Sequence, residues 1–80
     1  ILSSTSSQPK DLLSKQLIAA EYNYMNGAYI GGNKNLTFLF VWWGEYVLKN
    51  YTRYSSTYLI STKDWFDDYN NTHGGVIGGP

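Results

Sequence analysis

The feature that most constrains this chain is the absence of cysteine from a sequence of only 80 residues. A chain this short buries a modest fraction of its surface, so small domains commonly add disulfides, a metal or self-association. Without Cys, disulfides and thiolate metal sites are excluded, and a single His excludes a zinc site built from several His. We therefore expect no cofactor, and we expect aromatic packing, within the chain or between copies, to add stability.

The charge of the chain limits its partners. Six basic and six acidic residues give a formal net charge of zero, so no long-range field attracts nucleic acid or an anionic membrane. The longest apolar run, residues 36–43, is far shorter than the roughly 20 residues of a membrane span. Zero net charge also does little to keep copies apart. We predict self-association or binding to another extracellular protein.

The sequence divides into a helical domain at residues 9–73 and two tails. Residues 1–8 are rich in Ser and Thr, and residues 74–80 are rich in Gly; both have the composition of linkers or docking tails. Because the chain begins with Ile1 rather than Met, we expect a processed or excised product.

The first predicted helix begins near Pro9, which suits a first helical turn, with Ser7 as its cap. Asn26-Gly27 predicts its end, because both residues tolerate the left-handed conformation. Between them runs an apolar stripe at helical spacing. Its members are Leu13, Leu17, Ala20 and Tyr24, widened by Leu12, Ile18 and Met25.

The last predicted helix covers residues 55–70, with Ser55 or Ser56 as its cap. Its end is predicted by Asn70, Asn71 and Gly74. The predicted buried stripe again has helical spacing. It consists of Tyr58, Leu59, Thr62, Trp65, Phe66 and Tyr69.

The middle segment, residues 36–49, is ambiguous. Its Phe, Val, Trp and Tyr residues favour a strand, but the alternation of a strand is poor, and we favour a helix capped by Asn33 or Asn35. A helix this apolar on all sides is expected to be buried on nearly all sides. Its predicted stripe is Leu36, Leu39, Phe40, Trp43, Tyr46 and Val47. Three helices with short connections predict an all-α fold, a small three-helix bundle.

Three sites match the acceptor pattern for N-linked sugar, at Asn35, Asn50 and Asn70. Each lies at or near the end of a predicted helix, so two interpretations stay open. The residues carry N-linked glycans, or they simply cap helix ends, which Asn does well.

No arrangement of residues indicates catalysis, and we expect that the chain is not an enzyme. Asp64, Asp67 and Asp68 lie on a predicted helix, which favours a solvated face over a calcium loop. His73 precedes a Gly pair in a predicted loop, and no nucleophile or carboxylate is placed to work with it. None of the nucleophile, zinc-protease or phosphate-binding motifs is present.

Aromatic residues are the remaining candidates for a site. Trp42 and Trp43 are adjacent, so on a helix they point about 100° apart, and a small bundle can hardly bury both. We expect Trp42, Trp43, Tyr51 and Tyr54 to supply an interface, where Tyr and Trp are enriched.

Two stretches carry a resemblance to known proteins. Residues 14–23, SKQLIAAEYN, with Gly27 after them, and residues 63–71, KDWFDDYNN, are similar to the two helices of a short all-helical module. This module occurs near the C-termini of secreted bacterial and archaeal surface proteins, often beside repeat, anchor or dockerin-type domains. The resemblance covers about a third of the chain and brings no catalytic residues. It implies an extracellular or cell-surface location and a role in assembly.

Together these observations predict a non-catalytic, glycosylated subunit of an extracellular fibre or layer. The alternative is a partner-binding module excised from a larger secreted protein, with a dockerin-like role. A third possibility, a membrane-active peptide or toxin, requires an amphipathic basic face, whereas the Lys residues here are scattered.

Overall fold

The computed structural model describes residues 8–72, which contain three α-helices and no strand. The prediction of an all-α three-helix bundle is confirmed, and the ambiguous middle segment is a helix. Two single turns of 3-10 helix lie in the connections. The elements are α1 (Pro9–Met25), η2 (Ile30–Gly32), α2 (Lys34–Lys49), η3 (Tyr51–Arg53) and α3 (Ser56–Thr72).

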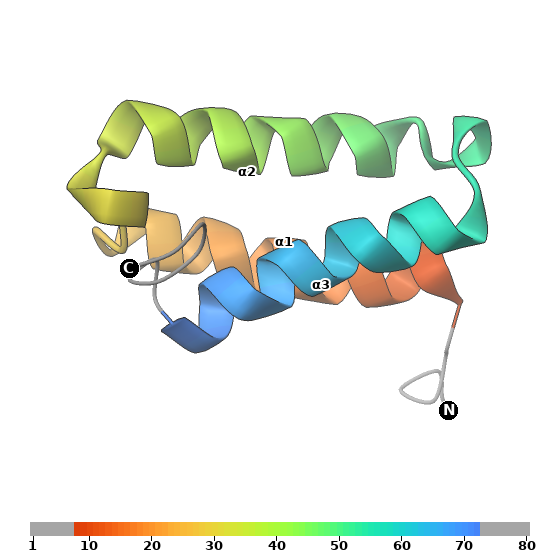
Figure 1. The fold of residues 1–80 in the computed structure, drawn as a ribbon, viewed down its shortest axis with the longest axis horizontal. Coiled ribbons are helices and arrows are strands. Elements are labelled where there is room, and N and C mark those ends of the chain that lie inside the picture. The colour runs from red at the N-terminus through yellow and green to blue at the C-terminus, as the bar shows by residue number, and fades with distance from the viewer. Residues whose placement is uncertain (1–7, 73–80) are drawn as a thin grey trace.

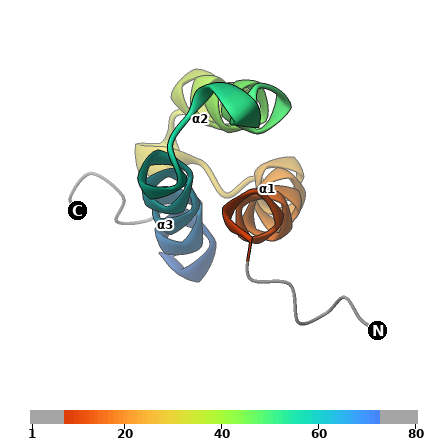
Figure 2. The ribbon, with the colours of Figure 1, turned by 90° about the vertical axis from the view of Figure 1, so that its right-hand side faces the viewer.

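The helices alternate in direction. α1 and α3 run the same way, and α2 runs back along them (Figure 1). Viewed end-on, the three helices form a triangle in which the chain enters α1 and α3 at the same end (Figure 2). Because the number of helices is odd, the start of α1 and the end of α3, and with them Gln8 and Thr72, lie at opposite ends of the bundle (Figure 1).

The predicted capping residues are confirmed at the starts of α2 and α3. Asn33 caps α2, since its Oδ1 accepts a hydrogen bond from the Leu36 N–H at 2.9 Å. Ser55 caps α3, since its Oγ accepts from the Tyr58 N–H at 3.1 Å. Both interactions satisfy backbone donors that the first helical turn leaves free.

The other helix boundaries agree with the prediction only in part. α1 starts at Pro9 with Gln8, not Ser7, at the cap position; Ser7 lies outside the described residues. The predicted end of α1 is confirmed, because Asn26 is its C-cap and Gly27 has a φ of +88°. α3 continues through the Asn pair to Thr72, and Gly74 lies outside the described residues.

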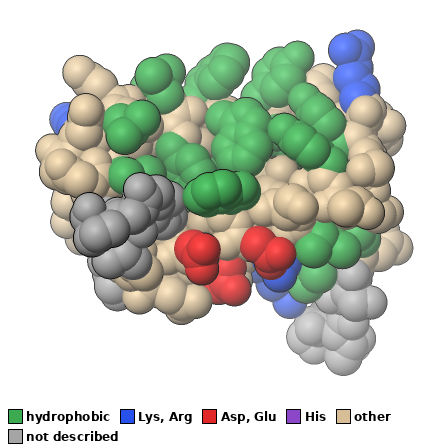
Figure 3. All heavy atoms as spheres, viewed as in Figure 1, with side chains coloured by type: hydrophobic (Ala, Val, Ile, Leu, Met, Phe, Trp, Pro, Cys, Tyr) green, Lys and Arg blue, Asp and Glu red, His purple; other side chains and the backbone are tan. Residues whose placement is uncertain are grey.

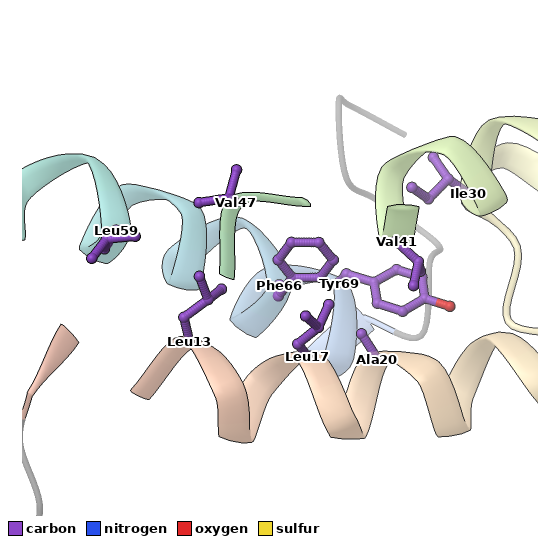
Figure 4. Packing of buried hydrophobic residues seen from close by; sticks show 9 residues of the cluster. All are labelled: Leu13, Leu17, Ala20, Ile30, Val41, Val47, Leu59, Phe66 and Tyr69. Atoms are coloured by element: carbon purple, nitrogen blue, oxygen red, sulfur yellow. The ribbon is translucent and has the colours of Figure 1, made fainter. Parts of the chain in front are cut away.

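The hydrophobic core lies where the three helices meet. Phe66 and Tyr69 point from α3 toward the centre of the bundle (Figure 4), and both are fully buried. The Phe66 ring stacks on Phe40 of α2, with ring centroids 4.2 Å apart. The buried hydrophobic residues are Leu13, Leu17, Ala20, Ile30, Val41, Val47, Leu59, Phe66 and Tyr69.

In α1 and α3 the residues at the centre of each predicted stripe are buried, whereas several residues at its edges are exposed. The buried residues of α1 and the four of α3 all belong to the predicted sets. Ile18 and Met25 were wrongly included, since they are 64% and 81% exposed. Tyr58 and Trp65 are also exposed. A three-helix bundle covers only a narrow strip of each helix, so the residues that widened the stripes stay in solvent.

Candidate interaction surface

α2 faces the core with its small residues. Its four buried residues are Thr37, Val41, Gly44 and Val47. The predicted buried stripe of this helix was therefore largely wrong, because Leu36, Leu39 and Tyr46 are exposed. Only Val47 of that stripe is fully buried, while Phe40 and Trp43 pack against the core half-buried.

A close helix approach explains why small residues face inward on α2. A Cβ atom built on Gly44 would lie 2.5 Å from Phe66 Cε2 and 2.9 Å from Leu17 Cδ1, and still nearer to Phe66 Cζ. Real Cβ atoms do not approach so closely, so only Gly fits where α2 crosses α1 and α3. Gly44 lies within the predicted helix over residues 36–49, but its orientation toward the core was not predicted.

Large hydrophobic side chains cover the opposite side of α2, which we call the outer face. Their exposed fractions run from 44% to 59%. Hydrophobic side chains are also visible along the flank of α2 that faces the viewer in Figure 3. Isolated hydrophobic residues are normal on a surface, whereas a group of this size makes the outer face a candidate interaction site. The outer face consists of Leu36, Phe38, Leu39, Trp42 and Tyr46. Leu36 and Phe38 lie on its two flanks, and the Phe38 ring also lies 6.4 Å from the ring of Tyr24 in α1.

An aromatic pair forms the centre of the outer face. The rings of Trp42 and Tyr46 stack with centroids 5.7 Å apart and planes 23° apart. Together with Glu45 and Lys49 they line a shallow hollow of about 280 Å³. The pair is one helical turn apart, so the helix itself holds the two rings together.

The two adjacent tryptophans separate as their spacing predicted. Trp42 is 55% exposed, whereas Trp43 is half-buried and stacks on Phe66 with ring centroids 5.9 Å apart. Trp43 therefore belongs to the packing of the domain, and Trp42 remains a candidate interface residue.

The two predicted tyrosines lie elsewhere. Tyr51 and Tyr54 line a second hollow, of about 240 Å³, beside the start of α1. Tyr51 lies under the Lys10 ammonium, with Nζ 5.6 Å from the ring centroid. Tyr54 is half-buried and stacks on Tyr58 with ring centroids 4.8 Å apart. The four predicted interface residues thus do not form one surface.

All three sugar-acceptor sites contain a residue with a structural role, and the roles at the first and third sites involve buried or partly buried groups. Thr37 is fully buried; its hydroxyl donates to the Asn33 carbonyl at 2.8 Å and accepts from the Ile30 N–H at 2.7 Å. Asn35 itself is exposed. It lies one turn before Leu39 and two turns before Trp42, so it shares the outer face with them. A glycan on Asn35 would cover that face.

The third of these sites is Asn70, which joins α3 to α1. Its Nδ2 donates to both the Gln16 carbonyl and Gln16 Oε1, at 2.9 and 2.8 Å, and its Oδ1 accepts from Asn23 Nδ2 at 2.9 Å. A glycosylated amide retains only one N–H, so sugar on Asn70 would remove one of these bonds. Asn50 is the C-cap of α2, and its Nδ2 donates to the Tyr46 carbonyl at 2.9 Å in an exposed position.

The acidic residues of α3 each lie on its surface. Asp64 forms an ion pair with Lys63 at 2.7 Å, a hydrogen-bonded contact that raises the pKa of Lys63. Asp67 accepts a hydrogen bond from Asn71 at 3.1 Å. Within residues 8–72, no group of three or more acidic, His or Cys side chains is placed to hold a metal ion. His73 lies outside the described residues.

Tyr69 was predicted as a core residue, but its polar role was not foreseen. Its hydroxyl donates to the Ala28 carbonyl at 2.5 Å, which ties α3 to the connection between α1 and α2. Burial is the main cause that raises the pKa of Tyr69 to about 12, and the phenols of Tyr29 and Tyr24 add to it.

Comparisons with known proteins give no family for this chain. It matches no protein-family model, no curated protein and no solved structure. In the part of the chain that the structure describes, none of the helices has the length and hydropathy needed to span a membrane.

Proposed function

We propose that this domain is a non-catalytic module that binds another protein through the outer face of α2. One observation carries the proposal: the fully buried residues of α2 are small, and five of its large hydrophobic residues are about half exposed. Burial of large apolar side chains is the main favourable term in both folding and association. A helix arranged in this way contributes little to its own domain from that side and offers the area to a partner.

The composition of the face favours a protein as the partner. Trp and Tyr at the centre of a patch are typical of the residues that dominate binding energy. Leu36, Phe38 and Leu39 extend the patch with apolar area, which suits a folded apolar surface better than a polar ligand. Glu45 and Lys49 beside the aromatic pair supply the polar rim that protein interfaces commonly have.

We further propose that the module works outside the cell, in a surface assembly. This location rests on the resemblance of residues 14–23 and 63–71 to a module of secreted surface proteins. Of the three sugar-acceptor sites, Asn50 is the one that fits the proposal best. Asn35 shares the binding face, and both N–H groups of Asn70 are used within the domain.

Site-specific photo-cross-linking in the native host tests the proposal. A photoreactive phenylalanine analogue replaces Tyr46 on the outer face and, as a matched control, Tyr22 on α1. Both are exposed tyrosines, at 44% and 69%. We expect one defined cross-linked product from position 46 and none from position 22. Equal labelling at both positions, or no product from position 46, would overturn the proposal.

A further inference from the structure

We infer that the partner of the outer face is the same face of a second copy of this chain. The two α2 helices would pack antiparallel, related by a twofold axis that passes between Leu39 and Trp42. This inference rests on the proposed function, because it names the partner for the surface proposed above. Three properties of the outer face support it: its area, the arrangement of its side chains and its charges.

The area reaches what a specific pair needs. Five large side chains are each about half exposed, and aromatic side chains bury roughly 150–250 Å² when fully covered. The face therefore offers on the order of 500 Å², which is about 1,000 Å² over two copies, at the lower limit for a specific interface. An interface of this area suits a weak dimer that exchanges with its monomers.

The arrangement of side chains on the face is compatible with this symmetry. A twofold axis between Leu39 and Trp42 places Leu39 of each copy at the level of Trp42 of the other. Leu39 is 59% exposed and Trp42 is 55% exposed, so both side chains are free to pack across the axis, as side chains of paired helices do.

The charges are also complementary. Lys34 and Glu45 are eleven residues apart, so they lie within about 20° of each other around the helix, on one edge of the outer face. Within residues 8–72 neither forms an ion pair. An antiparallel twofold pair brings identical edges together, so Lys34 of each copy meets Glu45 of the other. With a net charge of zero, no general repulsion opposes the pairing.

Sedimentation equilibrium of the purified 80-residue chain tests the inference. We expect a species of twice the 9.1 kDa chain mass, with a dissociation constant on the order of 10 µM. Leu39→Glu and Tyr46→Ala should each weaken the dimer by about tenfold or more. Ile18→Glu and Tyr22→Ala change exposed α1 residues of the same kinds and should leave the dimer unchanged. Circular dichroism confirms that each variant is folded.

A charge exchange tests the antiparallel arrangement. Lys34→Glu and Glu45→Lys should each weaken the dimer by about threefold at low salt, and the double variant should restore it. A dimer that the outer-face variants disrupt but the double variant does not restore would overturn the arrangement, since another register would leave these residues apart.

The remaining outcomes separate this inference from the proposed function. A chain that stays monomeric well above the expected dissociation constant overturns self-pairing. If position 46 then cross-links to a different protein, the proposed interaction module is supported and only the inferred partner is wrong. If position 46 yields no product, both the proposed function and the self-pairing are wrong. A glycan on Asn35, detected by intact mass and peptide mapping of native material, would also overturn self-pairing, because it would lie within the interface.

Discussion

The α1–α3 pair and α2 are held in the bundle in different ways. α1 and α3 present a mixed strip of aliphatic, aromatic and amide side chains to each other, and the polar atoms of Asn70 are fully used in that contact. α2 is the most apolar of the three helices, yet its fully buried residues are small and five of its large ones lie on the outer face.

This difference shows that hydrophobicity alone does not decide which side of a helix is buried. Close approach at Gly44 lets α2 pack against Phe66 and Leu17, and dispersion contacts depend on such approach. A bundle of three short helices has one core, so a helix that is apolar on two sides can bury only one within its own chain. The second side stays exposed to solvent in the single chain.

The largest expected effect comes from truncating an aromatic residue on each side of this comparison. Phe66→Ala removes a fully buried ring that touches both neighbouring helices and should lower the free energy of unfolding by about 3–5 kcal/mol. Trp42→Ala removes a larger but exposed ring, and under dilute, monomeric conditions it should cost less than about 1 kcal/mol. Urea denaturation of both variants measures the difference. Similar losses would mean that the outer face stabilises the monomer.

Alkaline pH should weaken the attachment of α3 to the connection before α2. The pKa of Tyr69 is raised from 10.0 to about 12, so the folded state holds this proton more tightly than the unfolded state does. The stability from the neutral phenol is complete below pH 10 and is lost as the pH rises from 10 to 12, by about 2–3 kcal/mol in total. Tyr69→Phe should flatten this part of the curve of unfolding free energy against pH. An unchanged slope would show that other tyrosines cause it.

A side chain at position 44 should push α2 away from the other two helices. Gly44→Ala places a methyl group against Phe66 and Leu17, and overpacking of this kind costs about 1–3 kcal/mol. The better helix propensity of Ala offsets about 1 kcal/mol of that cost. Glu45→Ala, one residue along and exposed, serves as the control and should be nearly neutral. Thermal unfolding followed by circular dichroism measures both, and a stabilised Gly44→Ala variant would contradict the close approach.

A comparably small effect is expected from the amide network of the α1–α3 pair. Asn70→Ala leaves Gln16 and Asn23 without their partner and should cost about 1–2 kcal/mol. The neighbouring Asn71 is exposed and bonds only to Asp67 among the described residues, so Asn71→Ala should cost less than about 0.5 kcal/mol. Equal losses in chemical denaturation would assign the effect to helix propensity rather than to the network.

The sequence allowed the helices to be predicted well because their signals are local. Asn33, Ser55 and the Asn26-Gly27 pair each act on the backbone within one turn, and all three positions were identified as helix boundaries. The buried centres of α1 and α3 were also predicted, since their apolar residues stand out against polar neighbours.

The orientation of α2 was not predictable in the same way. Its apolar residues surround the helix, so periodicity gives no contrast between inside and outside, and the predicted stripe was rotated toward the outer face. Gly44 looked like an interruption of an apolar run, because only tertiary packing shows that a neighbouring ring occupies its space. The separation of Trp42 from Trp43 was foreseen from their spacing. The predicted stripe contained Trp43 and not Trp42, although both were also predicted as interface residues.

The placement of Gln8 and Thr72 at opposite ends of the bundle has a mechanical consequence. A pull on the chain at these two residues acts along the helices and moves α1 and α3 past each other in shear. Contacts loaded in shear resist together, whereas contacts peeled from one end break one by one, so the α1–α3 strip and its amide network would bear the force. α2 lies outside this line of tension, and its outer face would remain presented while the domain is stretched.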